Sequence, residues 1–181
     1  MGLFNLFGRK PYERAGFELY TASVRAARAP YFFGTLGVPD TLDGRFDMVG
    51  LFVFLVVNRL HAASEEGKKL AQAVFDAMFS DMDINLREIG ISDMRVAKSV
   101  RDMWEAFNGR SSAYAAALAT GDEEVLAATI ARNVWRGREA DDSARALARM
   151  VMAQDRHLQV QPVEALFKGQ PGFLPTVQAA A

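Results

Sequence analysis

Apolar residues recur at helical intervals along most of this chain. From Pro11 onward, Phe17, Tyr20, Val24 and Ala27 stand three or four positions apart, which predicts one amphipathic helix opened by the proline. The strict alternation of apolar and polar residues that marks a half-buried strand is not found in the sequence, and neither is an internal repeat. The pattern therefore predicts an all-α fold.

Residues 48–57, the first part of a predicted helix over 48–60, differ from the other segments because they are apolar on every side. A helix without a polar face must be enclosed by other helices, and this run is shorter than the ~20 apolar residues that cross a bilayer. In the polar stretch before it, Asp40 is expected to cap the helix, while Asp43 and Asp47 place negative charge near the positive end of its dipole. We predict a single-domain bundle of about six to eight helices around this buried central helix.

Two further apolar stripes follow the central helix. Residues 64–82 form the first, and residues 81–88 either continue it in distorted form or make a separate short helix that stops at Gly90. Ser92 is expected to cap the helix that carries the second stripe, and Asn108-Gly109 should end that helix. The residues expected to face inward from this second helix are Met94, Ala97, Val100, Trp104 and Phe107.

The remaining sequence predicts shorter helices and an irregular end. The helices are expected over residues 110–118, between 120 and 137, over 141–151, and for one turn over 163–167. Prolines and glycines accumulate after residue 161. The predicted organisation is an N-terminal apolar and basic segment at 1–10, a helical domain at 11–161 and an irregular C-terminal tail at 162–181.

Composition narrows the class of protein. The chain has 181 residues, of which 50% are hydrophobic and 24% charged, and its net charge is -1, which argues against DNA binding through a broad basic face. The absence of cysteine removes disulfides, thiolate catalysis and cysteine-based metal centres. The first ten residues have apolar positions before basic ones, the reverse of a secretory signal, so a cytoplasmic location is expected.

The N-terminal segment has two readings. Its apolar residues followed by a basic pair fit peripheral contact with a membrane surface, where the basic pair is drawn to anionic head groups. The alternative is that the segment packs on the domain or is a mobile end. The residues concerned are Leu3, Phe4, Leu6, Phe7, Arg9 and Lys10.

Two small sets of side chains have the spacing of metal ligands. Asp40, Asp43 and Asp47 share a helical face, but their position at a helix start favours capping and a bond to Arg45. His61 and Glu65 are four apart, yet further ligands from neighbouring helices are missing. No metal or cofactor is expected. No phosphate loop or nucleophile triad stands out, so the chain is not predicted to be an enzyme; a metal-dependent helical enzyme is the weaker alternative.

Two groups of charged residues suggest partners. An acidic cluster, with two arginines among it, is either a self-paired surface or a docking rim. It comprises Asp76, Asp81, Asp83, Glu88 and Asp93, with Arg87 and Arg95. The second group would suit a ribosome- or RNA-associated adaptor, although nearby carboxylates dilute it. It comprises Arg132, Arg136, Arg138, Arg145, Arg149 and Arg156.

Several blocks of sequence, in order, resemble the ubiquinol-cytochrome c chaperone family. They are GVPDTLDGRFD at 37–47, FSDMD at 79–83, LREIG at 86–90, and AFNGR at 106–110 followed by Ala113 and Tyr114. The resemblance covers roughly residues 20–118 and implies an all-helical fold. It also implies a non-enzymatic chaperone that binds cytochrome b, or another subunit of the cytochrome bc1 complex, during biogenesis at the inner membrane. Mitochondrial relatives are linked to translation of cytochrome b, which keeps the ribosome as an alternative partner.

The blocks of this resemblance also supply the expected docking site. Charged side chains are seldom fully buried unless paired, so some of them should reach the surface beside apolar anchors. In the competing interpretation, Arg45 and Arg87 are internal clamps bonded to aspartates or helix ends. The expected partner-binding residues are Arg45, Phe79, Asp81, Met82, Asp83, Arg87, Arg110 and Tyr114.

Overall fold

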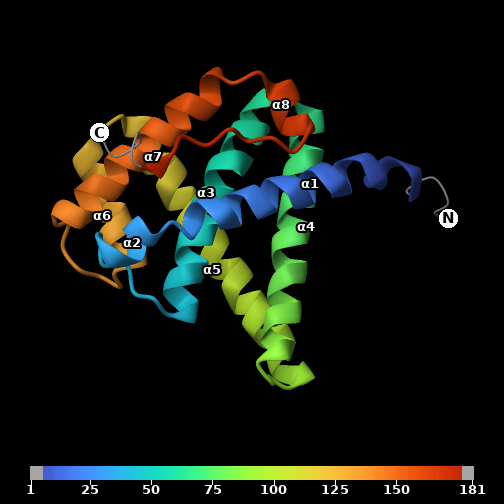
Figure 1. Ribbon diagram of the computed structural model, residues 1–181, viewed down its shortest axis with the longest axis horizontal. Helices are drawn as coiled ribbons and strands as arrows, with labels where there is room; N and C mark the ends of the chain where they lie inside the picture. Colours follow the sequence, from blue (N-terminus) through green and yellow to red (C-terminus); the bar gives the residue numbers. More distant parts are fainter. Residues whose placement is uncertain (1–5, 177–181) are drawn as a thin grey trace.

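The computed structural model describes residues 6–176, with side chains from Tyr12 onward. These residues contain eight helices and no strand. This confirms the predicted all-α bundle (Figure 1). The helices are α1 (Leu6–Ala27), α2 (Pro30–Gly34), α3 (Leu42–Ala63), α4 (Glu65–Glu88), α5 (Asp93–Thr120), α6 (Glu123–Val134), α7 (Asp142–Val160) and α8 (Val163–Phe167).

Helix α3 is the centre of the bundle, as predicted. Every residue from Phe46 to Val57 is buried, and α3 contacts α1, α4, α5, α6, α7 and α8. With 22 residues, α3 is long and apolar enough to cross a membrane, so the prediction that it is too short is wrong on length. However, 67% of its most apolar window is buried inside the fold, as in the core helix of a globular domain.

The start of α3 is capped by Thr41 rather than by Asp40. The Thr41 side chain accepts a hydrogen bond from the Gly44 amide at 3.1 Å. Asp40 instead accepts a bond from Arg45 at 2.6 Å, in an exposed ion pair. The predicted cap therefore lies one residue too early. Ser92, predicted to cap α5, stands at its N-cap but makes no side-chain cap bond, whereas the side chains of Ser64, Asp122 and Asp141, which were not predicted as caps, accept cap bonds in α4, α6 and α7.

Helix α1 begins at Leu6, upstream of the proline that was expected to open it. It crosses α4 closely at Gly16, where an added Cβ atom would lie 2.7 Å from Ala73. Tyr20 and Ala27 are buried as predicted, but Phe17 is 59% exposed because it lies outside this contact. Leu3 and Phe4 of the N-terminal segment lie outside the described residues, and the side chains of Leu6, Phe7, Arg9 and Lys10 are likewise not described.

Helix α5 is continuous, so the predicted break at Asn108-Gly109 is wrong. Its buried residues, Val96, Phe107, Tyr114 and Ala117, form one stripe along the whole length. Glycine within a helix costs only about 1 kcal/mol relative to alanine, which packing on both sides of Gly109 outweighs. The stripe also turns outward three residues that were expected to face the core: Met94 is 87% exposed, Trp104 is 51% exposed and Ala97 is exposed as well.

The chain after α7 packs back onto the bundle. The single helical turn predicted over 163–167 is α8, whose Leu166 is buried. Further on, the Phe173 ring packs edge-on against Phe52 of α3 with 5.3 Å between the ring centroids. Gln154 of α7 holds this segment by hydrogen bonds to both the amide and the carbonyl of Leu174.

The burial of α3 predicts the effect of a charge within it. We expect Phe52→Asp or Leu55→Asp to abolish cooperative folding, because an unpaired buried carboxylate costs as much as the whole stability of a typical domain, ~5–15 kcal/mol. Ala116→Asp, at an exposed position of α5, is the control and should lower the free energy of unfolding by about 1 kcal/mol or less. Urea denaturation followed by circular dichroism gives both values. A soluble Leu55→Asp variant with full helicity would show that α3 is not a core helix.

Candidate partner-binding site

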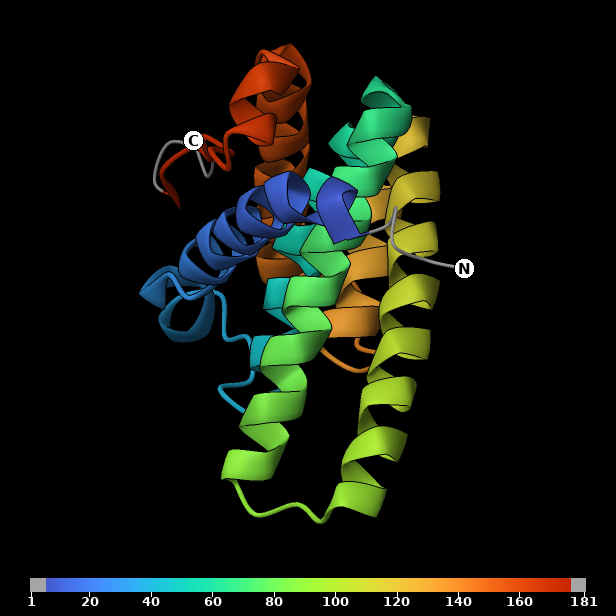
Figure 2. The ribbon, with the colours of Figure 1, turned by 90° about the vertical axis from the view of Figure 1, so that its right-hand side faces the viewer.

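Helices α4 and α5 form a hairpin whose joined ends extend beyond the other helices (Figures 1 and 2). Gly90 takes a φ of 85° in the turn, which lets the Ile91 amide bond back to the Leu86 carbonyl at 3.1 Å. This ends α4 and allows α5 to start at Asp93. The hairpin therefore presents both helices to solvent on a well-defined turn.

A groove lies between the two helices of the hairpin. It is an open hollow of about 420 Å³ with an apolar lining of Phe75, Phe79, Val100 and Trp104. Gln72, Asp76 and Asn108 supply the polar part of the lining. The Phe75 ring packs perpendicular to the buried Phe107 ring, with 5.1 Å between the centroids. We call this the α4–α5 groove. It has a rigid aromatic floor and an exposed tryptophan, which are features of protein-binding hot spots.

Apolar side chains are also exposed around the hairpin turn. Ile84 is 52% exposed, Ile89 is 62% exposed and Met94 is 87% exposed. A single exposed aliphatic residue is ordinary on a protein surface, but several on one protruding element mark an interaction surface. The hairpin thus combines a lined groove with an apolar turn.

Ion pairs join the two helices at this turn. Arg87 donates to Asp83 of α4 at 2.6 Å and also to Asp93 at the start of α5. The bond to Arg87 holds the pKa of Asp83 below its usual range. Because these side chains are exposed, the pairs add little stability and mainly fix the shape of the turn.

Asp81 connects the hairpin to the body of the protein. Its carboxylate accepts a hydrogen bond of 2.6 Å from the Tyr20 hydroxyl of α1. Burial of Tyr20, together with this bond to a carboxylate, raises the pKa of its hydroxyl above the usual value. Asp81 therefore has a structural partner and is only partly available to another protein.

A buried charge cluster lies at the start of α3. Asp47 has a fully buried side chain that accepts a hydrogen bond from Arg110 of α5, and Arg136 lies 3.2 Å from its other oxygen. Burial raises the pKa of Asp47 to about 6, although the positive charges of Arg110 and Arg136 act in the opposite direction. The cluster joins α3, α5 and the loop after α6, where Arg136 has a φ of 56°.

Several members of the other charged sets that the sequence singled out form ion pairs within the protein, although Arg132, Arg138 and Arg156 of the basic set are exposed. Asp43 lies 3.3 Å from Arg136, and Glu65 bonds to Lys68 rather than to exposed His61. Among the described residues, no group of three or more histidines or carboxylates is placed to hold a metal ion. In the basic set, Arg145 bonds to Glu124 at 2.8 Å and Arg149 to Glu123 at 2.7 Å, which reduces the positive charge available to RNA.

The eight residues expected to bind a partner do not form one patch. Phe79, Asp81, Met82, Asp83 and Arg87 lie on the hairpin, where Phe79 lines the groove and Met82 is buried. Arg110 and Tyr114 lie beside the buried Asp47, to which Arg110 bonds. The clamp interpretation was made for Arg45 and Arg87, and both are exposed: Arg45 pairs with Asp40 rather than with Asp47, and Arg87 pairs with Asp83 at the surface.

Sequence reasoning missed several residues of the hairpin surface. Trp104 and Val100 line the groove, and Met94 is exposed, although all of them were expected in the core. Reading α5 as one helix would have found this, because Val96, Phe107 and Tyr114 are separated by multiples of a helical turn that leave Trp104 at the edge of the stripe. Ile84 and Ile89 carried no signal that separates surface from core.

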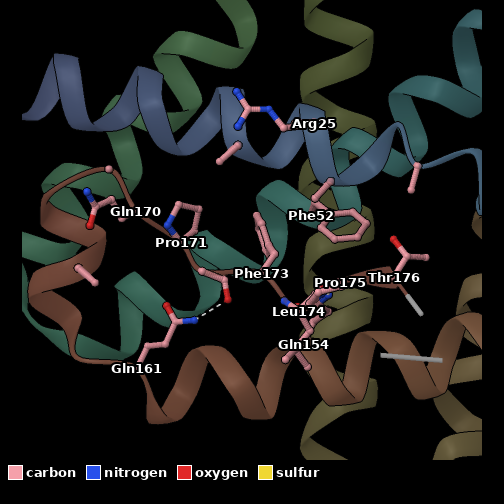
Figure 3. A pocket seen from close by; sticks show the side chains of 16 residues that line it. Arg25, Phe52, Gln154, Gln161, Gln170, Pro171, Phe173, Leu174, Pro175 and Thr176 are labelled. Carbon is pink, nitrogen blue, oxygen red and sulfur yellow. Dashed lines mark hydrogen bonds between the residues drawn. The ribbon is translucent and has the colours of Figure 1, made fainter. Parts of the chain in front are cut away.

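A second hollow lies between α1, α7 and residues 169–176 (Figure 3). It has a volume of about 720 Å³, and Phe52 and Phe173 form its apolar floor. Figure 3 shows Gln161 bonded to the Gly172 carbonyl, at 2.8 Å, and Arg25 projecting from α1 at the edge. The hollow is open and its polar groups mostly bond to the chain itself, so it is a weaker candidate for the principal site.

Comparison with known proteins places this arrangement in context. Residues 34–173 match the family model described as "Ubiquinol-cytochrome C chaperone". The ubiquinol-cytochrome-c reductase complex assembly factor 1 of Xenopus laevis is 27% identical over 128 residues, which are 71% of this chain and 63% of that protein. The chain therefore spans less than two thirds of this relative. The crystal structure of the Cbp3 homologue from Brucella abortus superimposes with a TM-score of 0.84 at 34% identity, over 98% of this chain and 99% of that one.

The Asp47 cluster makes a prediction about stability. Arg110→Ala leaves a buried carboxylate without its closest partner and should lower the free energy of unfolding by about 3–5 kcal/mol. Arg87→Ala breaks exposed pairs and is the control, with a much smaller expected loss because solvent screens these charges. Chemical denaturation of the two variants measures both. An equal decrease in the free energy of unfolding of the two variants would mean that the Asp47–Arg110 pair stabilises the fold no more than an exposed ion pair does.

The raised pKa of Asp47 predicts a pH dependence. Its folded-state pKa of about 6 lies above the unfolded value, so the folded protein binds the proton more tightly. The contribution of Asp47 to stability is therefore present at low pH and is lost as the pH rises from about 4 to 6, by roughly 2–3 kcal/mol. Relative to Asp47→Asn, the wild-type free energy of unfolding should fall by this amount between pH 4 and pH 7, and an unchanged difference would contradict the assignment.

Proposed function

The chain belongs to the ubiquinol-cytochrome c chaperone family, and we propose that it is a non-enzymatic assembly chaperone for the cytochrome bc1 complex that binds cytochrome b during its biogenesis. The name of the Xenopus relative, a complex assembly factor, supports this proposal, as does the similarity to the Brucella Cbp3 homologue over nearly the whole chain. The inner membrane is then the place where the client is handed over.

The observation that carries the proposal is the α4–α5 groove. A client of this kind consists of apolar helices that must be shielded from water until they reach the bilayer. Phe75, Phe79 and Trp104 offer apolar area with few rotatable bonds, so they lose little conformational entropy on binding. One apolar helix face lying in this groove is the recognition mode that fits the lining.

The charges near the groove can orient a bound client. Asp76 lies in the groove lining, and the Asp83, Arg87 and Asp93 pairs lie at the turn beyond it. Fixed charges beside an apolar groove add little affinity but favour one orientation of the client over the other. We assign client contact to Phe79, Asp83 and Arg87 on the hairpin. Arg110 and Tyr114 act through the support of α5, as buried residues behind the groove.

A ribosome-bound adaptor is the alternative function. It requires a positively charged face, whereas Arg136, Arg145 and Arg149 are each within ion-pair distance of carboxylates. Binding of an apolar client in the α4–α5 groove does not require a positively charged face, so we favour client binding. Sedimentation with ribosomes at several salt concentrations separates the two, since binding through arginine patches weakens steeply with salt.

Trp104→Asp tests the proposed function directly. Trp104 is 51% exposed, so the variant should fold normally while the new charge prevents an apolar helix from entering the groove. We expect at least about a tenfold loss of cytochrome b recovered with the tagged protein from membranes, together with reduced assembled bc1 complex in cells. Charge reversal at Asp81 and Asp83 is less decisive, because Tyr20 and Arg87 would lose their partners.

The matched control is Val160→Asp, which places the same charge at an apolar residue of α7 that is 79% exposed. It should leave both recovery of cytochrome b and bc1 assembly unchanged. Normal assembly in a cell that contains only the Trp104→Asp protein, at wild-type abundance, would show that the groove does not hold the client.

A further inference from the structure

The outer face of α1 carries an exposed aromatic residue among basic ones. Phe17 is 59% exposed in the middle of this helix, and it borders a hollow of about 450 Å³. Arg14 and Arg25 of α1 line the same hollow, one turn before and two turns after Phe17. The side chain of Arg14 is 84% exposed, and Arg25 is also exposed. This combination is typical of helices that lie in a membrane interface.

A residue far away in sequence completes the basic set. Lys168, just after α8, lines the hollow from the opposite side. It is brought close because Gly169, with a φ of 75°, lets the chain pass against Glu18, where a Cβ atom would lie 2.3 Å from the carboxylate. Glu18 is the only carboxylate among the residues that line the hollow, and it is bonded to Arg14 at 2.9 Å. The charges of Arg14, Arg25 and Lys168 therefore exceed the negative charge that faces them.

The hollow continues into apolar space. It shares Ala22, Arg25, Gly169 and Gln170 with the larger hollow of about 720 Å³ shown in Figure 3, which has Phe52 and Phe173 in its floor. Cationic side chains thus stand at the edge of an apolar depression. This order of polarity, from charged edge to apolar interior, is that of a phospholipid from head group to acyl chain.

We propose that the outer face of α1, defined by Arg14, Phe17, Arg25 and Lys168, docks on a bilayer that contains anionic phospholipids. The cationic side chains bind head-group phosphates, and Phe17 inserts between the acyl chains near the interface. The inference deepens the function proposed above, on which it rests for the biological role of the membrane contact.

Binding of the purified full chain to phospholipid vesicles tests this inference. The protein should sediment with phosphatidylcholine vesicles that contain about 30% phosphatidylglycerol and much less with pure phosphatidylcholine, and binding should weaken as salt rises. Arg25→Glu combined with Lys168→Glu should weaken binding at least about tenfold. Lys98→Glu combined with Arg101→Glu makes the same change of net charge on exposed positions of α5 and is the control.

Phe17→Ser tests the apolar part of the contact without changing the charge. It should reduce vesicle binding severalfold, whereas Met94→Ser, at an even more exposed apolar residue of the hairpin turn, should not. Failure of the wild type to bind anionic vesicles would overturn the inference, and so would equal losses in the α1 and α5 charge variants. Trp104→Asp should bind vesicles normally, so this inference and the client groove fail in separate assays.

Discussion

A helix without a polar face has to be surrounded, and this requirement organises the whole protein. From Phe46 to Val57, α3 offers no side that water solvates well, so α1, α4, α5 and α7 are each held by apolar contact with it. The outward faces of these helices do not contact α3, so contact with α3 does not determine which residues they carry. The α4–α5 hairpin extends past the end of the bundle, whereas the side of α1 away from α3 and α4 stays open to solvent (Figure 2).

Among the residues whose side chains are described, Asp47 is the one charged residue that is buried, and this follows from the same requirement. Asp47 begins the fully apolar part of α3, where its neighbours enclose it, and a buried carboxylate must be neutralised or paired. Arg110 pairs with it from α5, which fixes the rotation of α5 about its own axis. That rotation buries Phe107 and Tyr114 and turns Trp104 outward. The groove that we propose as the client site is thus linked physically to a buried ion pair on the other side of α5.

A feature of the fold was predictable from the sequence where the local pattern of residues agrees with the way the helices pack. The burial of residues 48–57 of α3 was predictable because no polar residue interrupts them. Asn108-Gly109 misled the prediction, since glycine ends helices only where tertiary contacts do not continue them. Of the apolar residues that line the α4–α5 groove, only Phe79 was among the expected partner-binding residues. The family blocks could not distinguish Phe79 from the inward-facing Arg110 and Tyr114, because sequence alone does not show which residues of a block face the core.

The arrangement of the two proposed surfaces constrains how they work together. Helix α1 crosses α4, and α4 lies between α1 and α5, so the hairpin runs across the axis of α1 (Figures 1 and 2). With the outer face of α1 on a bilayer, the hairpin would therefore lie along the membrane rather than pointing away from it. The α4–α5 groove would then stand about two helix diameters, ~20 Å, above the lipid head groups, because both α1 and α4 lie between it and the bilayer. The two proposed surfaces share no residue, so the protein can hold a client in the groove while α1 stays on the membrane.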